Sequence, residues 1–319
     1  MNQLNSETVK RLAKEVGFDL CGITTPEPIP QSSERFRRWL DRGYHDQMTY
    51  LARDPERRSD PRVLMPSVQS VVVLGLNYYQ PNSQVTPKSS GRVARFARGK
   101  DYHKVIERMG MQFVAMLSQV LGPGAGAEFR FLVDYGPMLE RAIAAKAGLG
   151  FIGKNSMLIS RQFGSWFFLA ELLTSLPLES DDPFAVNHGR CGTCNLCIEA
   201  CPTGAIVDDY TIDSRKCLSY LTIEKPSEID SKMASQLGDT VFGCDICQEV
   251  CPHNCRAVLT EHSELLPESG VGEFIDIDEV LKLTSQEEFL QFTAGTSLTR
   301  PKLEGLQRCA RIVRNNQAE

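Results

Sequence analysis

Seven of the chain's eleven cysteines stand in two runs of regular spacing. The first run, C-x-x-C-x-x-C-x-x-x-C-P, comprises Cys191, Cys194, Cys197, Cys201 and Pro202. The second run, C-x-x-C-x-x-x-C-P, comprises Cys244, Cys247, Cys251 and Pro252. The first spacing is that of bacterial two-cluster ferredoxins, in which the fourth cysteine binds the other cluster. The runs therefore predict two 4Fe-4S clusters, which would carry electrons to a site elsewhere in the chain.

The exchanged fourth cysteine divides the ligands between the two clusters. One cluster is complete, with the ligands Cys191, Cys194, Cys197 and Cys251. The other has only Cys201, Cys244 and Cys247, because Val241 stands where the second run would have its first cysteine. Cys217, which lies between the runs, is the best candidate for the missing ligand, and Cys255 is the alternative.

Other roles for these cysteines fit the pattern less well. Closely spaced thiolates also suit zinc, but the paired runs with their prolines match the two-cluster spacing better. A disulfide framework is not expected in a long chain that opens without an apolar signal segment. Cys21 and Cys309 are expected to be small buried apolar side chains or idle thiols.

Composition indicates a soluble protein of about two domains. The chain has 319 residues, of which 42% are hydrophobic, and a domain typically takes ~100–200 residues. No stretch approaches the ~18 apolar residues that a membrane helix needs. We expect a cytoplasmic monomer that does not contact a membrane, since cytoplasmic thiols stay reduced.

Charge is unevenly distributed along the chain. The formal net charge is −5, which argues against unspecific binding of nucleic acid. Residues 88–108 nevertheless contain seven Lys or Arg and two acids. Such a patch permits a directed contact with a polyanion, although solvated helix faces would give the same pattern.

Hydrophobic periodicity predicts strands that alternate with helices before residue 180. The expected strands cover residues 18–23, 71–76, 129–133 and 166–173. The expected helices cover residues 6–16, 36–40, 102–121 and 137–147, the last opened by Pro137. We divide the chain into an α/β domain over 1–180, the cysteine module over 181–258 and a helical segment over 259–319.

Several segments nearly match known nucleotide-binding or cobalamin-binding motifs. Residues 148–153 fit G-x-G-x-x-G but follow a helix, and Asn155 replaces the Ser or Thr of a P-loop, so neither nucleotide motif is supported. The glycine-rich turn would still let backbone approach a large ligand. Asp101 and His103 begin the D-x-H-x-x-G pattern that ligates cobalamin, but Ile106 replaces its Gly, so we do not expect His103 to bind cobalt.

Asp134 is the candidate acid. It ends an apolar strand, and strand ends in α/β layers bind ligands. Its apolar flank predicts a raised pKa, as a proton donor requires. A helix N-cap is the equally good alternative.

Four segments together resemble the epoxyqueuosine reductases over roughly residues 5–310. They are residues 133–141 (VDYGPMLER), 147–155 (AGLGFIGKN), 217–224 (CLSYLTIE) and 300–305 (RPKLEG). The two cysteine runs fit the same family, which is related to the reductive dehalogenases. Two features differ from many members: the chain ends soon after Arg314, without a helical-repeat extension, and His253 stands where Trp is usual.

The resemblance implies an α+β fold: a nitroreductase-like, cobalamin-binding α/β domain, a ferredoxin-like two-cluster module and a short helical tail. It implies an enzyme that reduces the epoxide of epoxyqueuosine at the wobble position of tRNA to queuosine. Base-off cobalamin, reduced through the two clusters by an unidentified protein, would supply the chemistry, and Asp134 would be the proton donor.

The resemblance also implies binding residues. Those expected near cobalamin are Arg57, Ala97, Asp134, Gly153, Lys154, Asn155, Ser156, Leu158, Ser165, Leu169, Ser219, Tyr220, Phe242 and Gly243. Those expected near the tRNA are Arg95, Arg98, Lys100, Tyr102, His103, Lys104, Thr222 and Glu224. Two rival functions remain open: a corrinoid iron–sulfur reductase of a small molecule, resembling a dehalogenase, and a ferredoxin-type electron-transfer protein.

Overall fold

A four-stranded antiparallel sheet forms the centre of the first half of the chain. Its strand order is β1-β2-β7-β4. The bounds are β1 Leu20–Thr24, β2 Ser70–Asn77, β4 Phe129–Leu132 and β7 Phe167–Thr174. Every residue of β2 is buried, as expected for a central strand rich in Val and Leu that pairs on both sides. The computed structural model describes residues 4–318.

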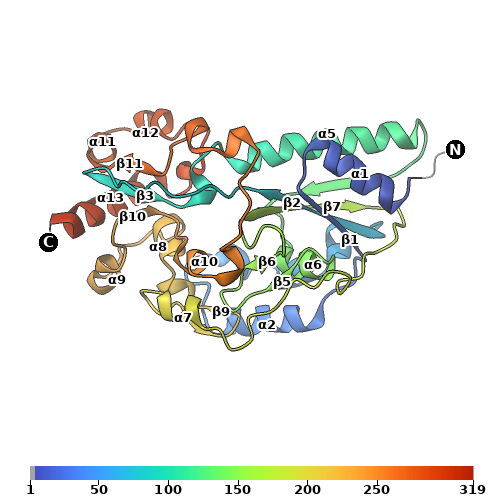
Figure 1. The fold of residues 1–319 in the computed structure, drawn as a ribbon, viewed down its shortest axis with the longest axis horizontal. Coiled ribbons are helices and arrows are strands. Elements are labelled where there is room, and N and C mark those ends of the chain that lie inside the picture. The colour runs from blue at the N-terminus through green and yellow to red at the C-terminus, as the bar shows by residue number, and fades with distance from the viewer. Residues whose placement is uncertain (1–3, 319) are drawn as a thin grey trace.

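Helices cover both faces of this sheet (Figure 1). Helices α1 (Ser6–Val16) and α5 (Tyr102–Leu121) pack on one face, against a core that includes Val72, Leu74 and Leu172. Helix α6 (Glu140–Lys146) packs on the other face, against a core that includes Val73, Leu132 and Leu173. Alternation along each strand therefore decides which side chains meet α6.

A second sheet joins segments that are far apart in sequence. Its order is β10-β3-β11, with β3 at Ser90–Val93, β10 at Thr240–Phe242 and β11 at Phe274–Asp276. Helices α8 (Leu218–Ile223), α11 (Ile277–Lys282) and α13 (Lys302–Ala318) supply its core partners. Each of the three predicted domains thus contributes one strand, and the division into those domains stays a prediction.

Short elements connect these layers. The remaining helices are α2 (Pro30–Asp41), α3 (Pro55–Ser59), α4 (Pro61–Leu64), α7 (Leu196–Ala200), α9 (Ser231–Ser235), α10 (Ile246–Glu249) and α12 (Gln286–Phe292). The remaining strands are β5 (Phe151–Ile152), β6 (Leu158–Ile159), β8 (Ile206–Asp208) and β9 (Thr211–Ile212). The 3-10 turns are η1 (Thr49–Leu51), η2 (Arg95–Ala97), η3 (Ser214–Lys216), η4 (Pro252–Asn254), η5 (Ser263–Leu265), η6 (Pro267–Ser269) and η7 (Ser297–Thr299).

The structure confirms an α+β fold and corrects two local expectations. Pro137 does not open a helix, because α6 begins at Glu140 after a succession of tight turns. The main sheet is antiparallel, so the rule that ligands bind at strand ends of parallel sheets does not apply to Asp134. Within residues 4–318, no helix is long and apolar enough to cross a membrane.

Candidate active site

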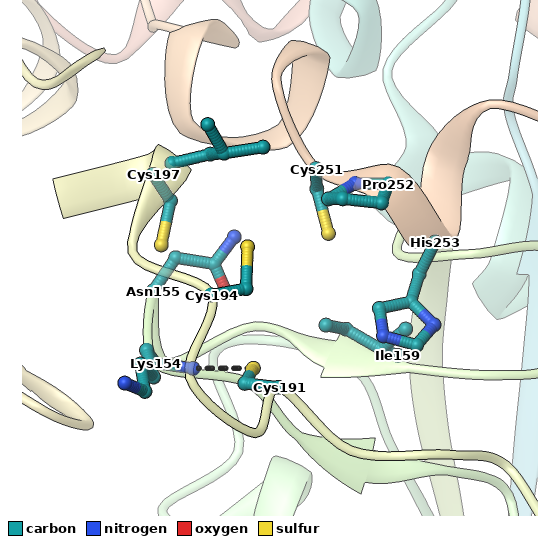
Figure 2. A pocket seen from close by; sticks show the side chains of 10 residues that line it. Lys154, Asn155, Ile159, Cys191, Cys194, Cys197, Cys251, Pro252 and His253 are labelled. Atoms are coloured by element: carbon teal, nitrogen blue, oxygen red, sulfur yellow. Dashed lines mark hydrogen bonds between the residues drawn. The ribbon is translucent and has the colours of Figure 1, made fainter. Parts of the chain in front are cut away.

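Four thiols from the two cysteine runs surround a small cavity of about 40 Å³. Figure 2 shows the sulfur atoms of this first thiol group, Cys191, Cys194, Cys197 and Cys251, directed toward a common space. Two of these residues precede α7, one lies within it, and the fourth follows α10. The backbone of the glycine-rich turn closes one side, where the Lys154 amide donates a hydrogen bond to Cys191 Sγ at 3.4 Å.

The glycine-rich turn is held tightly between cysteine segments. The Lys154 ammonium donates to Asn195 Oδ1 at 2.7 Å, and Asn155 Nδ2 donates to the Cys247 carbonyl at 3.2 Å. A Cβ at Gly153 would lie 2.6 Å from Ile159 Cδ1, so a larger residue there would displace the Ile159 side chain. Lys154 and Asn155 face the small cavity, whereas Ser156 lines a different, large cavity.

The other four thiols form a second thiol group: Cys201, Cys217, Cys244 and Cys247. Burial raises the pKa of Cys247 far above its usual value, and the Cys244, Cys217, Cys197 and Cys201 thiols add to that rise. Burial also raises the pKa of Cys244 to about 12, again with Cys217 and Cys201 contributing. Cys255 is exposed, whereas Cys217 is among the largest contributors to the raised pKa of both thiols. The structure thus brings Cys217, rather than Cys255, to this group.

Neither thiol group has the geometry of a single-ion site. Within residues 4–318, no three His, Cys, Asp or Glu side chains converge closely enough to hold one metal ion. A zinc ion would need its thiolates at ~2.3 Å. Thiols that are spread around a shared space suit a larger inorganic cluster, which the ferredoxin spacing also indicates.

The large cavity has a volume of about 1430 Å³. This exceeds the ~300–1,000 Å³ of pockets for drug-sized ligands. Its walls come from α2, the start of α5, the turn before α6, α8 and the η7 turn. Nine of the residues predicted to bind cobalamin or tRNA line it: Tyr102, His103, Lys104, Asp134, Ser156, Ser219, Tyr220, Glu224 and Phe242. Cys217 lines it as well, so the second thiol group reaches the cavity wall.

Asp134 lies at the centre of a hydrogen-bond network in this cavity. The Tyr102 hydroxyl donates to Asp134 Oδ2, and His103 Nε2 lies 3.1 Å from the same oxygen. His103 Nδ1 lies 2.7 Å from Asp101 Oδ1. The Tyr102 ring stacks on Phe168 with centroids 4.1 Å apart, which fixes the position of its hydroxyl. The N-cap of α6 is Leu139, so Asp134 does not cap that helix.

The expected raised pKa of Asp134 is wrong for this structure. Burial raises its pKa, but hydrogen bonds from His103 and Tyr102 outweigh burial and hold the pKa below its usual value. Burial lowers the pKa of His103, but bonding to Asp101 and Asp134 raises it overall to about 9. At neutral pH the proton therefore rests on the imidazole, and Asp134 is a carboxylate paired with it.

Comparison with known proteins decides the family. Residues 58–134 match the family model described as "Epoxyqueuosine reductase QueG, DUF1730", and residues 190–254 match the "4Fe-4S double cluster binding domain". The epoxyqueuosine reductase of Leadbetterella byssophila is 40% identical over 97% of this chain and 98% of its own length. That of Escherichia coli is 38% identical over 94% of this chain and 78% of its own length. The chain belongs to the epoxyqueuosine reductase family.

Solved structures of the family agree with this fold. A crystal structure of an epoxyqueuosine reductase with an epoxyqueuosine-modified tRNA stem loop has a TM-score of 0.87 at 28% identity, over 96% of this chain and 80% of that one. The Streptococcus thermophilus epoxyqueuosine reductase also has a TM-score of 0.87, at 27% identity over 99% and 82%. As a family member, the protein is an oxidoreductase with a double 4Fe-4S cluster binding domain.

Not all the predicted cofactor residues of this epoxyqueuosine reductase family member reach the large cavity. Besides Gly153, Lys154 and Asn155, those outside its lining are Arg57, Ala97, Leu158, Ser165, Leu169 and Gly243. Ser165 is buried and donates to Gln248 Oε1 at 2.9 Å, which ties the turn before β7 to α10. The Gly243 amide donates to Thr222 Oγ1 at 3.0 Å beside Cys244. Ser165 and Gly243 therefore contact the cysteine segments and do not line the large cavity.

Three predicted tRNA contacts are wrong because their side chains are buried. Arg95 pairs with Asp245 and Glu249, and Arg98 donates to Asn82 Oδ1 and the Val93 carbonyl. Thr222 is fully buried. Among the remaining predicted contacts, Lys100 is exposed but pairs with Glu264 at 3.0 Å, and Glu224 pairs with Arg300 at 2.8 Å.

Sequence reasoning missed a basic face of the cavity. Arg35, Arg38 and Arg42 of α2 and its C-cap line the large cavity, together with Arg58, Arg141 and Arg300. The spacing of the α2 arginines, i, i+3 and i+7, places them on one helical face and was available in the sequence. No local sequence pattern indicated that this helical face lines the same cavity as Asp134, because only tertiary folding brings the two segments to one cavity.

Proposed function

We propose that the protein reduces the epoxide of epoxyqueuosine in tRNA to the cyclopentene of queuosine. The reaction takes two electrons and two protons and releases one water molecule. The observation that carries this proposal is that one cavity, of about 1430 Å³, is lined by both Asp134 and Cys217. A proton-transfer group and the end of an electron path therefore meet at the same space. Membership of the epoxyqueuosine reductase family supports the same reaction.

The large cavity fits cobalamin in size and in chemistry. Corrin amide arms need hydroxyls and backbone groups around an apolar floor, and the lining includes Ser156, Ser219, Tyr220 and Phe242. Both ring nitrogens of His103 are engaged by carboxylates, so this histidine has no free nitrogen for a metal. That arrangement supports a base-off form without a histidine ligand. Bound there, the corrinoid would supply a strongly reducing cobalt centre to the epoxide carbon.

The two thiol groups would each hold one 4Fe-4S cluster. Cys191, Cys194, Cys197 and Cys251 would hold one, and Cys201, Cys217, Cys244 and Cys247 the other. When bound, the clusters supply single electrons, and the Cys217 position at the cavity wall directs them inward. The Lys154 amide bond to Cys191 is of the kind that tunes a cluster's potential. An unidentified protein would be the reductant.

Asp134 would deliver protons to the opening oxygen. The Asp134 carboxylate is held by Tyr102 and His103, and the proton nearest to it at neutral pH lies on His103. A cofactor and a substrate that fill the cavity would exclude water from Asp134. Burial is the cause that raises the pKa of Asp134, so this pKa would rise when the cavity is filled. Asp134 can then take the His103 proton and pass it to the developing alkoxide.

The RNA substrate would approach over the basic face of α2. Arg35, Arg38 and Arg42 lie at the cavity, as does the exposed Lys104 of α5, and such side chains suit phosphate contacts. The modified base must leave its loop to reach Asp134, as flipped bases do in other enzymes. A small-molecule reductase would have no use for this basic face, which therefore favours the RNA substrate.

The deciding experiment is an assay of the reconstituted protein with epoxyqueuosine-containing tRNA. Protein with both clusters and cobalamin, reduced anaerobically, should convert the modified nucleoside to queuosine, measured by mass spectrometry of the digested tRNA. Protein without cobalamin should give none. Equal conversion without cobalamin would refute the corrinoid part of the proposal. No conversion of tRNA, with turnover of a small halogenated substrate, would favour the dehalogenase-like alternative.

A further inference from the structure

A buried glutamate stands in the middle of the main sheet without a partner. Glu171 of β7 is fully buried, and neither of its carboxyl oxygens has a hydrogen-bond partner among residues 4–318. In register it lies between Val73 of β2 and Leu132 of β4, which both belong to the core under α6. An isolated carboxylate in such surroundings is strongly disfavoured, so the group is expected to hold a proton.

Glu140 of α6 lies on the side of its helix that faces the sheet around Glu171. Glu140, Ile143, Ala144 and Ala147 follow the spacing i, i+3, i+4 and i+7, which puts them on one side of the helix. The last three are buried in the core that contains Val73 and Leu132, so this side faces the sheet around Glu171. Oε1 of Glu140 is buried and has no hydrogen-bond partner in the part of the chain that the structure describes, yet the residue also lines the large cavity with Asp134.

The charges around this pair favour its protonated form. Burial raises the pKa of Glu140 to about 8, and the Asp134 carboxylate adds to the rise, while Arg141, the Asp134 backbone and His103 oppose it. Burial also raises the pKa of Glu171, with Glu140 and Asp134 contributing. Arg58 of α3 and Tyr102 of α5 are the other titratable groups that sense the charge of Glu140.

We propose that Glu140 and Glu171 form a proton store that recharges Asp134. The inference rests on the proposed function, because that reaction consumes two protons at one oxygen while Asp134 can carry one at a time. His103 supplies the first proton through Asp134. The Glu140 carboxyl then gives its proton to the Asp134 carboxylate, which passes it on as water leaves. Glu171 remains protonated beside the new Glu140 carboxylate, and solvent restores the two protons lost from His103 and Glu140 after the product departs.

The test uses Glu140→Gln and Glu171→Gln in the holoenzyme, reduced in advance so that electron delivery is not limiting. Single-turnover rates are measured between about pH 6 and pH 10. For the unaltered enzyme the rate should fall as pH rises through about 8, where Glu140 loses its proton. Glu140→Gln should be slower by about 10²-fold at neutral pH, and its rate should fall only as pH rises through about 9, where His103 loses its proton. Glu128→Gln, an exposed acid just before β4, is the control and should match the unaltered enzyme.

A second readout needs no cofactor. Infrared spectra of the apoprotein at neutral pH should contain the band of a protonated carboxyl that is lost in Glu171→Gln and changed in Glu140→Gln. Normal rates and an unchanged alkaline limb in Glu140→Gln, or a spectrum without such a band, would overturn the proposal. The proposed function fails separately: in that case the unaltered holoenzyme would not convert epoxyqueuosine, whereas failure of the store alone leaves the unaltered enzyme active and Glu140→Gln as fast as it.

Discussion

The two thiol groups both draw on the two cysteine runs, the second with Cys217 added, but they lie in different surroundings. Around the first group, Gly192, Thr193 and Asn195 are exposed. Around the second, Val241, Phe242 and Leu218 are buried, and Cys217 forms part of the large cavity's wall. The difference predicts that electrons would pass from the first thiol group to the second. A protein reductant can approach the first group, whereas only the second adjoins the space in which the reduction would take place.

Removing the cluster of the second thiol group, which adjoins the large cavity, should have the largest effect on activity. Cys217→Ala should leave one cluster intact, lose about half of the bound iron and abolish queuosine formation, because the remaining cluster is the one farther from the cavity. Iron analysis and the tRNA assay measure both effects. Cys255→Ala is the matched control and should change neither. Full iron content in Cys217→Ala, with a loss in Cys255→Ala, would exchange the roles of the two cysteines.

Asp134→Asn separates proton delivery from both thiol groups. The variant keeps the shape of the side chain but cannot carry a proton, so single-turnover reduction should slow by about 10²–10⁴-fold. Its iron content and the visible spectrum of bound cobalamin should match those of the unaltered protein. Near-normal turnover would show that the proton reaches the oxygen directly from Tyr102 or His103, which both adjoin Asp134.

Removing the cluster of the first thiol group should have a smaller effect on activity, and the size of that effect should depend on the reductant. Cys191→Ala should lose the first cluster only. Activity driven by a protein reductant should disappear, while activity driven by a strong chemical reductant that can enter the large cavity should persist in part. Equal losses under both reductants would show that the two groups are not ordered in a path from surface to cavity.

The smallest effect is expected on RNA binding. If Arg38 and Lys104 contact phosphates, Arg38→Gln and Lys104→Gln should each reduce the slope of log affinity against log salt by about 0.7–0.9. Filter binding with the tRNA at several salt concentrations measures this slope. Lys232→Gln, on the short helix α9, is the control. Unchanged slopes in both variants would show that these two side chains are solvated and do not contact RNA phosphates.

The sequence predicts some parts of this site well and others not at all, for physical reasons. Ligand spacing is local, so the cysteine runs predicted seven of the eight thiols and left Cys217 and Cys255 as candidates for the eighth, and the end of an apolar strand made Asp134 a candidate. Burial of charge is not local. Arg95 belongs to a basic stretch, but its charge is met by Asp245 and Glu249, about 150 positions away, and it never reaches the surface. The basic face of α2 is recognisable as a face, but its target exists only in the folded chain.

The β10-β3-β11 sheet has a consequence for the order in which the protein matures during synthesis. Strand β3, at residues 90–93, finds its backbone partners only at residues 239–242 and 273–276. Contacts so distant in sequence form late, after the intervening chain has left the ribosome. The cavity wall at Phe242 depends on that sheet. A nascent chain released before residue 276 would therefore carry most of its cysteines but no finished cavity, so clusters could be inserted before the large cavity is complete.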